Sequence, residues 1–105
     1  MTVQPIRFDP DIFNNLSNQE IASYFDHAGG SLVSGYWQSA PESLEINLRT
    51  DQFELCVILA GEVELTYRDG GSHVFKERDI FVMPGGTQCI WRTVRPVKKF
   101  YMICN

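Results

Sequence analysis

The residues best suited to chemistry in this 105-residue chain are an acid and two thiols that lie among apolar neighbours. Glu54 and Cys56 lie two residues apart in the apolar run 53–60, and Cys89 lies two residues before Trp91. Because side chains alternate along a strand, we expect Glu54 and Cys56 to share one side, and Cys89 and Trp91 likewise. A metal site of these thiols and Glu54 would be unusual, because free cysteine is often a small buried hydrophobe. We therefore predict no metal or other cofactor, with this thiol–carboxylate metal site as the alternative.

A carboxylate inside a barrel needs a compensating charge, since an unpaired buried charge is costly or takes up a proton. Lys99 is the predicted partner of Glu54, because it alternates with apolar residues on one face of the segment 97–104. Arg49 is the alternative partner. A second interpretation of the pattern leaves Lys99 facing water.

We expect the Glu54–Lys99 pair to form the floor of a pocket with aromatic and small polar residues around it. Such a pocket suits a small polar ligand, for example a carboxylate, an amide or a sugar fragment. Trp37 is expected to pack in the core instead. Glu54 is also the candidate catalytic residue, as a general acid or base. The candidate ligand-binding residues are Asn47, Arg49, Glu54, Cys56, Cys89, Trp91, Lys99 and Tyr101.

Short strands are expected to position these residues. From residue 31 the chain shows strand-like segments at 31–39, 43–50, 53–60, 62–67, 73–75, 79–83, 88–94 and 97–104. The sequence Asp69-Gly70-Gly71 is a strong hairpin-turn signal, and Pro84-Gly85-Gly86 interrupts the chain. Short strands with frequent turns predict an all-β barrel or sandwich.

Residues 1–30 differ in character and are predicted to form a short helical segment before the barrel of residues 31–105. Ser17 and Glu20 fit a capping box, apolar residues follow at helical spacing within 21–25, and Gly29-Gly30 would end the helix. We expect this helix to cover the outside of the barrel. A partner-binding helix is the alternative.

Composition and charge narrow the class of protein. A chain of 105 residues, 44% of them hydrophobic, has the size and composition of one globular domain. The net charge of −4 disfavours nucleic acid or an anionic membrane as partner. An odd number of cysteines with no paired spacing, and no signal peptide or apolar span, suggests a reduced, cytoplasmic chain.

Together these segments resemble a cupin, whose two motifs can be written G-x5-H-x-H-x3,4-E-x6-G and G-x5-P-x-G-x2-H-x3-N. Glu54 precedes Gly61 at the spacing of the first motif, and Pro84-Gly85-Gly86 supplies the P-x-G of the second. The stretches SGYWQS (34–39), LCVILAGEVELTYRDG (55–70) and DIFVMPGGTQCIWRTVRPVKKFY (79–101) look like small single-domain cupins related to (S)-ureidoglycine aminohydrolase. The resemblance covers about residues 34–104 and implies a jelly-roll β-barrel, commonly as a homodimer.

The histidines that hold a metal in many cupins are missing from the matching positions. The first-motif histidines fall on Leu48 and Thr50, or on Asn47 and Arg49, and the second-motif histidine falls on Cys89. The only two histidines of the chain are elsewhere, at residues 27 and 73, where we expect surface positions. The chemistry of the aminohydrolase rests on a metal site that this chain does not reproduce.

Three functions remain open on sequence grounds. The first is a small cupin without the metal-binding histidines that binds a small polar metabolite in the barrel pocket. The second is a hydrolase or isomerase of the ureidoglycine aminohydrolase type, in which Glu54 acts as acid or base. The third is a purely structural role, with a barrel edge pairing in a homodimer.

Overall fold

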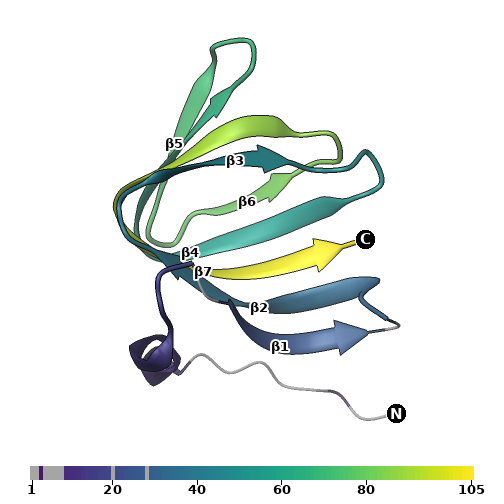
Figure 1. Ribbon diagram of the computed structural model, residues 1–105, viewed down its shortest axis with the longest axis vertical. Helices are drawn as coiled ribbons and strands as arrows, with labels where there is room; N and C mark the ends of the chain where they lie inside the picture. Colours follow the sequence, from purple (N-terminus) through teal and green to yellow (C-terminus); the bar gives the residue numbers. More distant parts are fainter. Residues whose placement is uncertain (1–2, 4–8, 20, 28) are drawn as a thin grey trace.

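Among the residues that the structure describes, seven strands form one antiparallel sheet that folds over on itself into two facing halves (Figure 1). The computed structural model describes residues 3, 9–19, 21–27 and 29–105. The elements are the 3-10 helix η1 (Pro10–Asn15) and the strands β1 (Ile21–His27), β2 (Leu32–Ser39), β3 (Ser43–Asn47), β4 (Phe53–Tyr67), β5 (Ser72–Lys76), β6 (Ile80–Met83) and β7 (Gln88–Cys104). The all-β prediction is therefore confirmed. No helix among these residues is long and apolar enough to cross a membrane.

The long strands β4 and β7 pair with each other over most of their length and run through both halves of the folded sheet. The first half of β4 also pairs with β6, and the second half of β7 with β2, which makes one half of the folded sheet. The second half of β4 pairs with β5, and the first half of β7 with β3, which makes the other half. The sequence pattern predicts two shorter strands in place of each long one. The register of the β4–β7 ladder shifts near the predicted break in β4, between Ile58 and Val63.

Gly61 lies at this bend with a φ of +89°, a conformation that side-chain-bearing residues rarely adopt. A Cβ at this position would lie 2.0 Å from the carbonyl oxygen of Pro96. Glycine therefore allows the backbones of β4 and β7 to approach closely at the point where the sheet turns over.

The inward faces of the two halves of the folded sheet form the core. Along β4 and β7 buried residues alternate with more exposed ones, as expected for strands with one face inward. The buried cluster consists of Cys56, Ile58, Val63, Leu65, Phe81, Met83, Cys89, Trp91 and Val97. The hairpin predicted at residues 69–71 is confirmed, because the Tyr67 and Gly71 backbones close the turn with a 2.8 Å hydrogen bond.

The helix predicted to begin at Ser17 is wrong. The only described helix is the turn η1, and the predicted apolar stripe lies in β1, which pairs with β2. Gln19 shows why: its φ of +61° is incompatible with a helix, and its backbone amide donates to Gln38 O at 2.8 Å. The pairing edge offered by β2 therefore overrides the local helical pattern. Glu20, the other half of the predicted capping box, lies outside the described residues.

The outside of β2 is instead covered in part by η1. The Phe13 ring packs edge-on against Tyr36, with ring centroids 5.6 Å apart. Gln38 holds the end of η1 through hydrogen bonds from its amide to the carbonyl oxygens of Phe13 and Leu16, at 3.3 and 2.6 Å.

Candidate functional site

A buried ion pair joins the two long strands. The Lys99 Nζ lies 2.8 Å from Glu54 Oε2, and the two residues are only 8% and 7% exposed. The predicted pairing is confirmed, and the interpretation that leaves Lys99 in water is wrong. Cys56, two residues after Glu54, donates its thiol to the same oxygen at 3.1 Å, while its sulfur lies 3.8 Å from Lys99 Nζ. Within the described chain, the other Glu54 oxygen, Oε1, receives no hydrogen bond.

Three aromatic rings surround the Lys99 ammonium. Its nitrogen lies 4.5 Å from the ring centroid of Trp91, 4.9 Å from that of Trp37 and 6.0 Å from that of Tyr101. Rings at these distances stabilise a cation through their electron-rich faces. Trp91 is held in place by its own hydrogen bond, from Nε1 to Thr93 Oγ1 at 3.1 Å. The ion pair and these rings together form a preorganised polar centre with apolar walls.

These groups line a pocket of about 200 Å³, which we call the Lys99 pocket. Apolar side chains from β3 and β7 complete its wall, and Gln19 lies at its edge. The lining residues are Gln19, Trp37, Leu44, Ile46, Glu54, Trp91, Lys99, Tyr101 and Ile103. Four candidates named from sequence, Glu54, Trp91, Lys99 and Tyr101, are thus brought together.

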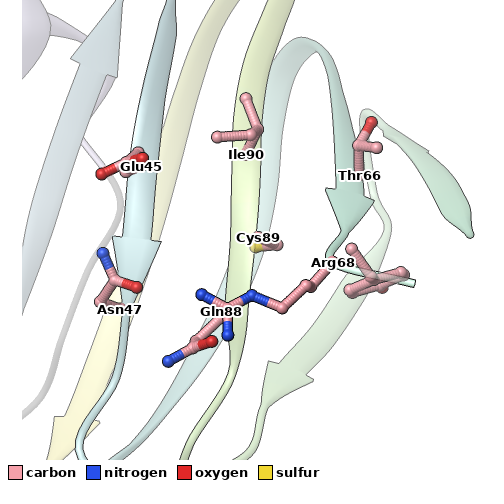
Figure 2. A pocket seen from close by; sticks show the side chains of 8 residues that line it. Glu45, Asn47, Thr66, Arg68, Gln88, Cys89 and Ile90 are labelled. Atoms are coloured by element: carbon pink, nitrogen blue, oxygen red, sulfur yellow. The ribbon is translucent and has the colours of Figure 1, made fainter. Parts of the chain in front are cut away.

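The remaining candidates do not line the Lys99 pocket. Asn47 and Cys89 line a separate pocket of about 180 Å³ at the far end of β3 (Figure 2). Arg68 and Gln88 also line this second pocket (Figure 2). Cys56 is fully buried beneath the ion pair.

Arg49 forms an exposed ion pair with Asp51 at 3.0 Å, so the alternative partnership of Arg49 with Glu54 is wrong. Asn47 does not line the Lys99 pocket because Leu44 and Ile46 take the inward positions of β3 and Asn47 lies on its exposed face. Cys89 is on the inward face with Trp91 but lies two residues before it in β7, opposite Tyr67.

Sequence reasoning missed Trp37 as a pocket residue. Trp37 is only partly buried, and it lies directly across from Lys99 in the β2–β7 register. Cross-strand neighbours on one face lie close together, so this register brings the Trp37 ring to the ammonium. The two strands are about sixty residues apart in sequence, and no local pattern reveals their register.

Burial keeps the Cys56 and Cys89 thiols and the Tyr101 phenol protonated. It raises the pKa of the Cys56 thiol strongly, the positive charge of Lys99 opposing and the Glu54 charge adding to the shift. The pKa of the Tyr101 phenol is also raised, first by burial and then by the charge of Glu54. Burial likewise raises the pKa of Cys89. None of these groups supplies a thiolate or phenolate near neutral pH.

The side chains around Glu54 do not fit the metal ion that many cupins hold. A cupin-type metal needs several nitrogen or oxygen ligands, whereas no three or more His, Cys, Asp or Glu among the described residues are grouped so that they could hold a metal ion. A cation also already occupies this position, because the Lys99 ammonium is within hydrogen-bond distance of Glu54. Of the histidines, His73 contacts the Tyr67 hydroxyl at 2.9 Å on the β4–β5 hairpin.

Known proteins share this fold. A cupin domain of Schizosaccharomyces pombe Cnp3 matches with a TM-score of 0.73 and 21% identity, over 87% of this chain and 68% of that one. A cupin-2 domain protein of Shewanella frigidimarina matches with a TM-score of 0.78 and 12% identity, over 95% and 94%. At these identities the likeness concerns the fold alone.

Matches in sequence identify the family more specifically than likeness in fold. A DUF861 family protein of Thermotoga maritima is 33% identical over 63% of this chain and 73% of that chain, with a TM-score of 0.58. No curated protein matches significantly. The family model described as the EutQ-like cupin domain matches residues 27–101, which include all of β4, most of β7 and the ion pair. The chain is therefore a member of the EutQ-like cupin domain family.

Proposed function

We propose that this cupin binds a small, uncharged polar metabolite in the Lys99 pocket. The observation that carries the proposal is the Glu54–Lys99 ion pair enclosed by Trp37, Trp91 and Tyr101. Apolar walls with a few fixed polar groups are the usual composition of a small-molecule site. Here the polar groups are already held in position, so a ligand would not need to order them on binding.

The charge balance of the pair favours an uncharged ligand. Lys99 and Glu54 neutralise each other, so an anion gains little from Lys99 without also meeting the carboxylate. A ligand that accepts a hydrogen bond from Lys99 and donates one to Glu54 Oε1 matches both groups. An amide, a hydroxy compound or a carbonyl compound that also carries a hydroxyl group has this chemistry. The volume of about 200 Å³ is below that of pockets for drug-sized molecules, which favours a small metabolite.

Intrinsic fluorescence tests this proposal directly, because the only two tryptophans of the chain both line the pocket. Panels of small amides, polyols, carbonyl compounds and carboxylates would be titrated into the protein while tryptophan emission is recorded. We expect saturable quenching by an uncharged compound. Glu54→Gln should weaken that binding moderately, and Arg49→Met, at the exposed ion pair, should leave it unchanged.

Two results would contradict the proposal. One is the absence of a saturable fluorescence change or a thermal shift with every class of compound. The other is equal binding by wild type and Glu54→Gln, which would place the ligand outside the Lys99 pocket.

Acid–base catalysis by Glu54, in a hydrolase or isomerase resembling ureidoglycine aminohydrolase, has less support. Oε2 already accepts from Lys99 and Cys56, which leaves Oε1 for proton transfer. Neither the family description nor the Thermotoga protein's description names such a reaction. Glu54→Gln separates the two functions, because an acid–base role predicts lost turnover with the ligand still bound.

A homodimer and a cytoplasmic location belong to the same proposal. The β6 strand pairs with β4 alone and exposes Ile80 and Val82, 65% and 53% accessible, which favours its contact with a second copy. The three cysteines are free thiols, in keeping with a reducing compartment.

A further inference from the structure

We infer that Lys99 captures a small aldehyde or ketone as a protonated imine, with Glu54 moving the protons. This inference rests on the proposed function, because the carbonyl compound would occupy the Lys99 pocket. It adds a covalent step to that binding.

The placement of Lys99 distinguishes it from the other amines of the described chain. Lysines that form imines are typically desolvated in apolar pockets with a nearby group to move protons. Lys99 lines such a pocket and is 8% exposed, whereas Lys76 is exposed on β5 and Lys98 points to the opposite face of β7. Lys98 instead lies over the Phe13 ring on the outside of the barrel.

Glu54 supplies the proton transfers that imine formation needs. Its Oε2, 2.8 Å from Lys99 Nζ, takes a proton from the ammonium and leaves a neutral amine. The amine nitrogen forms a bond to the carbonyl carbon, and the carbonyl oxygen takes the proton from Glu54 to become a hydroxyl. Glu54 then removes the second proton from nitrogen and delivers it to that hydroxyl. The carbon–oxygen bond breaks, water leaves, and a carbon–nitrogen double bond remains.

The charges of the site are the same before and after this reaction. The ammonium and the aldehyde become a protonated imine and water, while Glu54 ends as a carboxylate. The imine nitrogen remains positive, so the buried Glu54 keeps a partner and the surrounding rings keep a cation. The neighbouring Cys56 does not compete as a nucleophile, because its thiol is buried and protonated.

Reductive trapping tests the inference. Folded protein would be incubated with propanal and sodium cyanoborohydride, which reduces an imine to a stable secondary amine, and the modified residues identified by peptide mass spectrometry. We expect at least about tenfold more label on Lys99 than on Lys98 or Lys76. Unfolding in urea should remove this preference. Glu54→Gln should slow labelling of Lys99 and leave that of Lys98 unchanged.

Label spread evenly over the lysines of the folded protein, or a Lys99 that stays unlabelled, would overturn the inference. This wild-type comparison does not depend on the folding of any variant. The results that would exclude the imine differ from those that would exclude reversible metabolite binding. A compound that quenches tryptophan emission reversibly while Lys99 stays unlabelled leaves the binding function intact and excludes the imine, whereas a labelled Lys99 in a protein that no compound quenches excludes reversible metabolite binding.

Discussion

Trp37 and Trp91 meet at nearly a right angle beside the Lys99 ammonium, with ring centroids 5.6 Å apart and ring planes inclined by 88°. One tryptophan comes from β2 and the other from the first half of β7, so the contact joins the two halves of the folded sheet. Edge-to-face packing fixes both rings. Lys99 is thereby held by side chains from both halves as well as by Glu54.

Lys99→Met is expected to lower the free energy of unfolding by about 3–5 kcal/mol, because Glu54 stays buried without its cation. The double variant Glu54→Leu/Lys99→Met should recover most of this loss, since no unpaired charge remains. Urea denaturation followed by circular dichroism measures both. Arg49→Met removes an ion pair with side chains 62% and 72% exposed and should cost less than about 1 kcal/mol. Equal losses for Lys99→Met and Arg49→Met would contradict the buried pair.

Gly61→Ala should destabilise the protein by about 3 kcal/mol, because the new Cβ meets the Pro96 carbonyl and the backbone keeps a positive φ. Gly70 is a matched control. Its φ is +93°, but a Cβ added there would have nothing within 4 Å, so Gly70→Ala should lose only about 1 kcal/mol. Urea denaturation midpoints compare the two variants. Similar losses would mean that strain in φ, and not the approach of β4 to β7, dominates at Gly61.

The protein should lose stability as the pH rises above about 9. Burial raises the pKa of the Cys56 thiol, so the unfolded chain releases this proton near the ordinary value of 9.0 while the folded chain retains it. The unfolded state is then favoured by up to about 1.4 kcal/mol per pH unit. Urea denaturation between about pH 8 and pH 10 measures the slope. Cys56→Ala should reduce it, and Cys104→Ala, at the end of β7, is the control. An unchanged slope in Cys56→Ala would assign the effect to other groups.

The sequence predicted those parts of the structure that depend on local alternation. Glu54 and Cys56 share a side, and Lys99 lies on the buried face of its strand, because the period of a strand is fixed by its geometry. Two tertiary features could not be predicted in this way. The pairing of β1 with β2 overrode a helical pattern, and the β2–β7 register brought Trp37 to Lys99. Asn47, by contrast, was wrongly placed at the pocket although β3 alternates as expected, because Leu44 and Ile46 take its inward positions.

The proposed homodimer should depend on the exposed edge strand β6. Ile80→Lys/Val82→Lys places two charges on β6, and we expect it to convert a dimer to a monomer. Val74→Lys, at a similarly exposed residue of β5, is the control and should leave the dimer intact. Size-exclusion chromatography with light scattering measures the mass. A wild-type monomer at high concentration, or a dimer that survives both substitutions, would exclude β6 as the interface.

The shared long strands also determine how the molecule can come apart. Strands β2, β3, β5 and β6 each pair with β4 or β7, and β1 is attached through β2. Neither half of the folded sheet can therefore unfold while the other persists, since both contain parts of β4 and β7. Amide hydrogens of the β4–β7 ladder should exchange only through global opening and mark the slowest-exchanging unit of the protein. Their pairing joins segments far apart in sequence, so its formation is expected to limit the folding rate.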